Sequence, residues 1–170
     1  SDYSEIRYEG FGPDGVSIII EALTDNKNRT ASEVRTVFNK FNGNLGENGC
    51  VSYLFDKIGS IIYPSSSGEI DNFIEFSIEN DTKDIIENND FYEIITKLEN
   101  FNEITENFTE KFGHPENANI IWKAKDLVKV SENSILTTYK LISGLDDCED
   151  VQNVFYNFEF DEQDLALIEQ

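Results

Sequence analysis

The sequence has few of the residues on which metal sites, disulfide scaffolds and membrane spans depend. Its 170 residues include one histidine, two cysteines, one tryptophan, three prolines and no methionine. The longest purely aliphatic run is Ile18–Ile20, far short of the roughly 20 residues that a transmembrane helix needs. Residues 1–9 have neither the basic nor the apolar segment of a secretory signal peptide. We therefore expect a globular chain with no membrane partner.

The cysteines and the histidine form no catalytic or metal-binding pattern. Cys50 and Cys148 lie far apart in the sequence, and no CxxC pair exists, which predicts reduced thiols. His114 stands in a Gly-His-Pro sequence typical of a turn. We expect no metal, no cofactor, no small-molecule substrate and no catalytic residues.

Basic residues are scarce and unevenly distributed. Thirteen Lys and Arg residues against 34 Asp and Glu residues give a formal net charge of −21. Residues 1–57 contribute −3, residues 58–128 contribute −10 and residues 129–170 contribute −8. The chain as a whole is repelled by phosphate backbones, so any nucleic-acid contact is expected in the nearly neutral first third or in sequence absent here. The acidic excess by itself is typical of a surface that only keeps a protein dissolved.

Hydrophobic periodicity predicts an α+β chain with two domains. Residues 60–125 read β-α-β-β-α-β, the order of the split βαβ motif. The segments on either side supply β-β-α-β and α-β. We therefore expect two ferredoxin-like α/β sandwich domains, one inserted into the other: a discontinuous domain of residues 1–57 and 129–170, and an inserted domain of residues 58–128.

Several element boundaries follow from local patterns. Thr30-Ala-Ser-Glu33 matches a capping box, which predicts a helix start at Thr30. Cys50–Phe55 reads as a strand. Gly144 is expected to end a helix, and the alternating aromatic residues of positions 154–160 predict a final strand.

A basic loop before the first helix is the main candidate for a binding site. Lys27, Arg29 and Arg35 fall within nine residues of an acidic chain, at the start of a helix whose N-terminal amides favour anions. Arg and Asn side chains suit phosphates and base edges. The competing interpretation is a polar cap loop whose cations are balanced by Asp25 and Glu33.

Other candidate sites have weaker support. The Gly43–Gly49 loop lacks the GxxxxGK[ST] pattern of a nucleotide-binding loop. The acidic runs Asp146–Asp150 and Asp161–Asp164 lack EF-hand spacing. The aromatic residues of the final strand either stack on bases or, as is commoner, belong to the core.

Several motifs occur in a fixed order along the chain. They are Tyr8-Glu-Gly-Phe-Gly-Pro-Asp-Gly-Val16, Glu21-Ala-Leu-Thr-Asp-Asn-Lys-Asn-Arg-Thr30, Glu33-Val-Arg35, Gly43-Asn-Leu-Gly46, Val51-Ser-Tyr-Leu-Phe55 and Asp150-Val-Gln-Asn-Val-Phe-Tyr-Asn157. Together they closely resemble the YebC family, which includes bacterial YebC proteins and the mitochondrial translational activator of cytochrome c oxidase subunit I. The resemblance is specific over residues 5–57 and 145–158, and through residues 60–128 it extends only to the element order.

This resemblance implies an architecture and a role. Family members begin with a basic helical domain that this chain lacks, so we expect a trimmed or proteolysed product, in agreement with the absent Met. The resemblance also implies two further α+β domains, one inserted in the other, and no enzymatic activity. It implies a cytoplasmic location in a bacterium, or the mitochondrial matrix in a eukaryote.

The resemblance places expected nucleic-acid contacts on two segments. It implies that the chain binds RNA on the ribosome and assists translation, with ribosomal proteins as further partners. The alternatives are a DNA-binding regulator of transcription and a module that binds only proteins. The expected nucleic-acid-binding residues are Asn26, Lys27, Asn28, Arg29, Thr30, Arg35 and Asn44.

Overall fold

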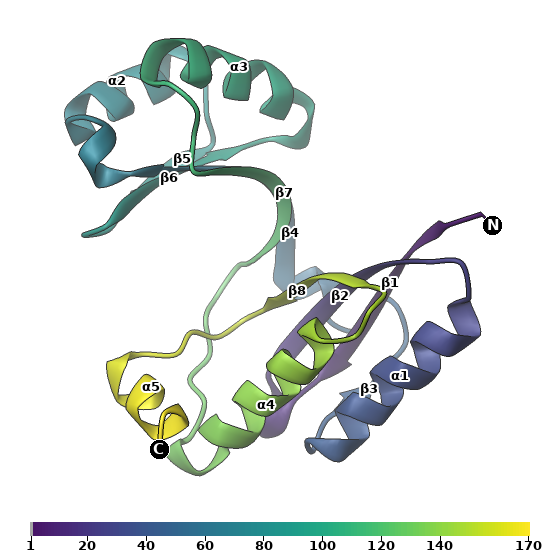
Figure 1. Cartoon of the computed structure of the whole chain (residues 1–170). Coiled ribbons are helices and arrows are strands. Elements are labelled where there is room, and N and C mark those ends of the chain that lie inside the picture. Colours follow the sequence, from purple (N-terminus) through teal and green to yellow (C-terminus); the bar gives the residue numbers. More distant parts are fainter. Residues whose placement is uncertain (1) are drawn as a thin grey trace. The chain divides into compact units, whose positions relative to one another are not determined.

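The chain folds into two compact α/β units. The structure is a computed structural model that describes residues 2–170. Residues 2–56 and 123–170 form the first unit, and residues 57–122 form the second. Each unit contains a four-stranded antiparallel sheet covered by helices, so the expected α+β class with two sandwich units is confirmed (Figure 1).

The sheet of the first unit is built on one long hairpin. Strands β1 (Ser4–Phe11) and β2 (Ser17–Thr24) pair along their whole length and are joined by a 3₁₀ turn at Pro13–Gly15. The short β3 (Asn44–Leu45) pairs with β1, and β8 (Val151–Tyr156) pairs with β2. The strand order is β3-β1-β2-β8.

Helices α1 (Lys27–Lys40) and α4 (Ile135–Asp146) lie side by side on one face of this sheet (Figure 1). The periodicity of the sequence explains the packing, because α1 buries Val34 and Phe38 against the side chains of β2 that face it. A third helix, α5 (Glu162–Ile168), packs against α4. This layer fixes the position of α1, which carries most of the candidate binding residues.

The second unit has the predicted β-α-β-β-α-β order and the strand order β5-β6-β4-β7. Its helices meet in an aromatic core, where the Phe73 and Phe112 rings stack with centroids 3.9 Å apart. The elements are β4 (Phe55–Pro64), α2 (Ile70–Glu79), β5 (Asp84–Glu87), β6 (Phe91–Thr96), α3 (Phe101–Phe112) and β7 (Asn117–Ala124). Further 3₁₀ turns span Ser52–Leu54, Ser65–Ser67, Leu98–Asn100 and Glu132–Ser134.

Three local expectations are wrong. Cys50–Phe55 is not a strand, because Ser52–Leu54 forms a 3₁₀ turn and β4 begins at Phe55. Gly144 lies inside α4 rather than after it, at a point where the helix passes close to α1: an added Cβ would lie 2.9 Å from a Val37 methyl group. The final strand also ends at Tyr156, and the chain turns into α5.

Candidate nucleic-acid interface

The N-terminus of α1 forms within the basic loop. The helix begins at Lys27 and is capped by Asn26, whose Oδ1 accepts a hydrogen bond from the Arg29 N–H at 3.1 Å. An asparagine oxygen at this position satisfies one of the unpaired N–H groups of the first turn. The expected capping box of Thr30 and Glu33 is therefore wrong: the helix starts one turn earlier, and Thr30 lies inside it.

The carboxylate of Asp150, the residue directly before β8, binds the start of α1. Asp150 accepts hydrogen bonds from the hydroxyls of Thr30 at 2.7 Å and Thr24 at 3.2 Å, and from Arg29 Nη2 at 2.9 Å. These donors, Thr30 foremost, hold the pKa of Asp150 below its ordinary value. Arg29 also donates to Asp25 at 3.0 Å, and its pKa is raised by Asp150 first and then by Asp25.

These contacts assign structural roles to two expected nucleic-acid contacts. Thr30 is fully buried and its hydroxyl donates to Asp150, so we assign it a structural role rather than a nucleic-acid contact. Arg29 is 43% exposed, but its one positive charge lies against two carboxylates, and an incoming phosphate meets net negative charge there. The cap-loop interpretation expected Asp25 and Glu33 to balance the cations of the loop. Asp25 does form an ion pair with Arg29, but the second carboxylate partner of Arg29 is Asp150.

The remaining cations of this segment lie on an exposed flank of α1. Asn28 and Arg35 are two turns apart and share this flank, which faces away from the pocket that Val37 and Glu33 line with α4. Lys27 lies at its start. Neither Lys27 nor Arg35 has an ion-pair partner within 4.0 Å in the described part of the chain. We call Lys27, Asn28 and Arg35 the α1 outer flank.

The charge of Arg35 reaches the sheet beneath the helix. Tyr8 of β1 is buried, and its hydroxyl has no hydrogen-bond partner among residues 2–170. Burial raises the pKa of Tyr8, the nearby charge of Asp150 raises it further, and Arg35 opposes the shift. Arg35 itself is exposed, and no carboxylate of residues 2–170 lies within 4.0 Å of its guanidinium group.

Asn44 stands apart from the α1 outer flank. It lies in β3, after the C-terminal end of α1, and pairs with Phe11 of β1. The backbone approaches closely here, because a Cβ added at Gly10 would lie 2.6 Å from the Asn44 carbonyl oxygen. Lys27 and the last residue of α1 are about 20 Å apart along the helix, so the two candidate segments do not form one compact site.

A buried carboxylate that was not among the predicted site residues holds the end of the Gly-rich loop and the residues after it. The Glu9 side chain is fully buried on β1 and accepts N–H donors from Gly49 at 2.8 Å, Val51 at 3.1 Å and Ser52 at 2.7 Å. Burial would raise the pKa of Glu9, but these N–H groups, with Arg7 Nε at 3.1 Å, lower it below the ordinary value. Glu9 lies in the first of the motifs that resemble the YebC family, and this was the only sign in the sequence that it has a particular role.

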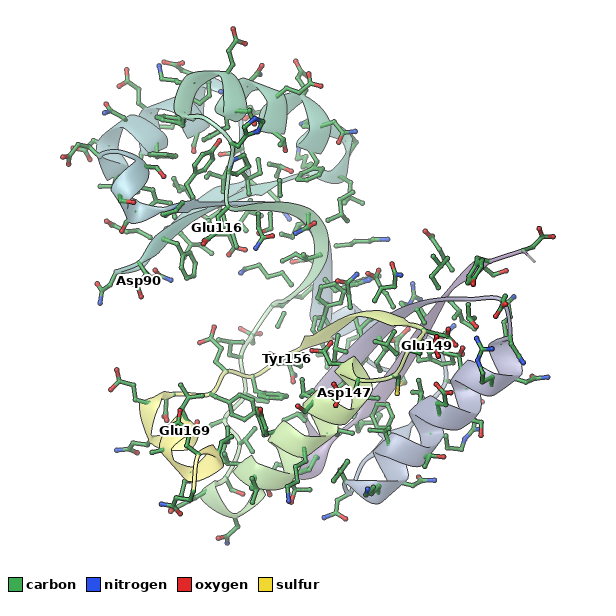
Figure 2. All side chains as sticks on the ribbon, in the orientation of Figure 1. Asp90, Glu116, Asp147, Glu149, Tyr156 and Glu169 are labelled. Carbon is green, nitrogen blue, oxygen red and sulfur yellow. The ribbon has the colours of Figure 1, made fainter. Side chains whose placement is uncertain are left out.

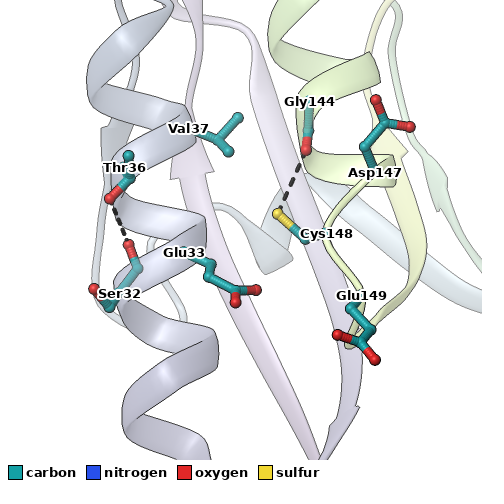
Figure 3. Close-up of a pocket in the computed structure, with 8 residues that line it drawn as sticks. All are labelled: Ser32, Glu33, Thr36, Val37, Gly144, Asp147, Cys148 and Glu149. Atoms are coloured by element: carbon teal, nitrogen blue, oxygen red, sulfur yellow. Dashed lines mark hydrogen bonds between the residues drawn. The ribbon is translucent and has the colours of Figure 1, made fainter.

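A shallow pocket between α1 and the end of α4 has the wrong charge for phosphate (Figure 3). Three of its side chains, Glu33, Asp147 and Glu149, are carboxylates. Burial raises the pKa of the Cys148 thiol, whose Sγ lies 3.4 Å from the Gly144 carbonyl oxygen, so the thiol is neutral. Within residues 2–170, no group of three His, Cys, Asp or Glu side chains is arranged to hold a metal ion. The pocket is lined by Ser32, Glu33, Thr36, Val37, Gly144, Asp147, Cys148 and Glu149.

A known protein family contains the motifs that Asp150 joins in this structure. The family model described as the TACO1/YebC second and third domain matches residues 3–158. The chain belongs to the TACO1/YebC family. Two of its motifs, which include Arg29 with Thr30 and Asp150, are joined in the structure by the hydrogen bonds described above.

A solved structure of high similarity supports the same architecture. The crystal structure of a conserved hypothetical protein, Aq1575 from Aquifex aeolicus, is 39% identical in sequence, with a TM-score of 0.85. The match covers 94% of this chain and 66% of that protein, so the present chain spans slightly less than two thirds of its length.

The TACO1/YebC family is a family of regulators of transcription or translation. Among residues 2–170, no helix has both the length and the apolar character required to cross a bilayer.

Proposed function

We propose that this chain binds RNA on the ribosome and assists translation, and that the α1 outer flank makes the RNA contact. The observation that carries the proposal is the pair of exposed cations, Lys27 and Arg35, without carboxylate partners in residues 2–170 of an acidic chain. Arginine forms strong charge-assisted hydrogen bonds to phosphate, and Asn28 beside it can reach sugar or base-edge groups.

The net charge favours the ribosome over bare duplex DNA as the binding partner. At −21, most of the chain is repelled by phosphate, so binding through one flank needs compensation elsewhere. Ribosomes present RNA together with basic protein surfaces, which an acidic chain attracts. The proposed partners are therefore ribosomal or messenger RNA and basic ribosomal proteins.

Co-sedimentation with ribosomes tests this proposal. The chain, a Lys27→Ala/Arg35→Ala variant and a Lys129→Ala/Lys140→Ala control are pelleted with ribosomes at 50 to 300 mM salt. Lys129 and Lys140 are exposed in the same unit, so both variants lose two positive charges. We expect the first variant to bind several-fold more weakly and to lower the salt slope by about 1.4 to 1.8, while the control changes little.

Other outcomes would select a different function. Equal weakening by both double variants would contradict the placement of the site on the α1 outer flank. Tight binding to promoter duplex without ribosome binding would favour the transcriptional alternative. Retention on ribosomes with no salt dependence and no effect of either variant would indicate a module that recognises only protein.

A further inference from the structure

One stretch of the second unit carries a strong excess of negative charge. Residues 69–90 include eight Asp and Glu residues and only one basic residue, Lys83. None of these carboxylates has an ion-pair partner within 4.0 Å anywhere in residues 2–170. This stretch comprises α2, β5 and the β5–β6 turn, whose tip carries Asp90 (Figure 2). Such a surface attracts positively charged partners and repels anionic ones.

The same stretch contains an open sheet edge. Strand β5 is the last strand in the order β5-β6-β4-β7, so its outer side has no neighbouring strand within residues 2–170. The Asn88 N–H donates to the Phe91 carbonyl oxygen at 3.0 Å, and the alternation of antiparallel pairing then turns the Glu87 and Ile85 N–H groups outward. The Ile85 N–H instead meets the Asp84 carboxylate at 2.8 Å.

Two exposed isoleucines lie on the flank of α2 that faces away from α3. Ile78 is 75% exposed and Ile74 is 38% exposed, and they are one turn apart. Phe76 and Asn80, on the other flank, contact α3 through Phe108 and Asn107. Because α2 also packs on β5, the two isoleucines lie on the side of the helix next to the open sheet edge.

The charge of this surface restricts what can bind there. Nucleic acids and anionic membranes are repelled by it. A second copy of this chain would bring another −21 charges and pair two acidic edges. A basic polypeptide in extended conformation fits all three features: its backbone completes the sheet edge, its cations meet the carboxylates, and apolar side chains contact Ile74 and Ile78.

We propose that the β5 edge surface, consisting of Ile74, Ile78, Asp84 and Glu87, binds a lysine- or arginine-rich segment of a partner protein as an added β-strand. This interaction is separate from the α1 outer flank and does not depend on RNA binding. It uses the strongly acidic part of the chain, which the proposed RNA contact leaves unused.

Fluorescence polarisation with defined peptides tests the proposal. The probe is a fluorescein-labelled ten-residue peptide of alternating Lys and Val, measured with the whole chain at 50 mM salt. The comparison peptides are alternating Glu and Val, and a block peptide with five Lys followed by five Val. We expect the alternating Lys peptide to bind at least fivefold more tightly than the block peptide, and the Glu peptide not to bind.

Two matched pairs of variants identify the surface. Glu87→Pro removes an outward N–H without removing a bond to β6, and Glu87→Gln removes the same charge but keeps the N–H. Ile78→Ser removes an apolar contact, and Ile120→Ser makes the same change at an exposed residue of β7, the opposite edge strand. We expect Glu87→Pro and Ile78→Ser to weaken binding at least fivefold relative to their controls.

Specific results would overturn the inference. Equal affinity for the alternating and block peptides would show attraction by charge alone. Equal affinities of Glu87→Pro and Glu87→Gln, with the Glu87 amide exchanging equally fast with and without peptide, would exclude strand addition. Dimerisation of the chain that Glu87→Pro abolishes would identify a second copy as the occupant. Because Ile78 is exposed, Ile78→Ser tests the surface even if Glu87→Pro fails to fold.

Discussion

At the residue scale, the acidic positions of this chain divide into two kinds. Most Asp and Glu side chains are exposed, whereas Glu9, Glu93 and Asp150 are buried, and Glu9 and Asp150 each accept several hydrogen bonds. Each joins segments far apart in the sequence: Glu9 holds the loop around Val51 to β1, and Asp150 holds the start of α1 to β8. Carboxylates with several donors are stabilised in the charged form, which explains why both pKa values are lowered.

The buried carboxylate of Asp150 gives a pH-dependent prediction. Asp150→Asn leaves hydroxyl and guanidinium donors without a charged acceptor and is expected to lower the free energy of unfolding by about 1–3 kcal/mol at pH 7. Because the folded pKa lies below the unfolded value of about 3.9, this stabilisation is present above that value and is lost as the pH falls through the folded pKa. The difference between the chain and the variant should therefore shrink between pH 5 and pH 3.

Urea unfolding at pH 7, 5 and 3 measures this difference. Asp126→Asn, at an exposed position, is the matched control and should differ little from the unchanged chain at each pH. A difference for Asp150→Asn that stays constant down to pH 3 would contradict the assignment of a lowered pKa to this carboxylate.

At the element scale, the hydrophobic periodicity of α1 was a reliable guide to its packing, whereas the capping pattern misplaced its start. The apolar stripe of α1 was predicted, because the contacts of Val34 and Phe38 depend only on spacing. The cap was misplaced because two residue types that favour N-caps, Asn26 and Thr30, occur one turn apart. What decides between them is Asp150, which accepts the Thr30 hydroxyl and so places Thr30 inside the helix.

The observed cap gives a prediction for α1. Asn26→Ala removes the oxygen that accepts the Arg29 N–H and should lower the free energy of unfolding by about 1 kcal/mol. Asn28→Ala, two residues later on the exposed side, removes the same side chain without removing a cap and should change stability by less than about 0.5 kcal/mol. Chemical denaturation of both variants measures the effects, and equal losses would argue against Asn26 as the cap.

At the scale of the whole molecule, negative charge is poorly compensated. Arg7 pairs with Glu9, and Arg29 pairs with Asp25 and Asp150, whereas the eight carboxylates of residues 69–90 have no such partner in residues 2–170 and the net charge is −21. Repulsion among exposed carboxylates therefore opposes folding, and added salt should screen it more than it weakens the few pairs. The sheet and core of each unit provide the stability that outweighs this repulsion.

A salt titration tests this balance. We expect the midpoint of urea unfolding to rise as NaCl increases from 20 to 500 mM at pH 7, because urea is uncharged and leaves the ionic strength unchanged. At pH 4, where part of the carboxylates are protonated, the same increase in salt should have a smaller effect. A midpoint that falls with salt at pH 7 would show that the ion pairs outweigh the repulsion.

The sequence by itself determined the class of the fold, the order of elements in the second unit and the family, because these depend on spacing along the chain and on ordered motifs. It also identified the basic segment that leads into α1. The tertiary structure decided which residues of that segment are available for binding. Asp150, which is distant in sequence, forms an ion pair with Arg29 and accepts a hydrogen bond from the buried Thr30 hydroxyl. Lys27 and Arg35 have no ion-pair partner within residues 2–170. Likewise, Glu9 captures the N–H groups of Val51 and Ser52, so the expected strand there forms a turn instead. Local patterns cannot reveal such outcomes, because a buried carboxylate selects its partners only when the fold brings them together.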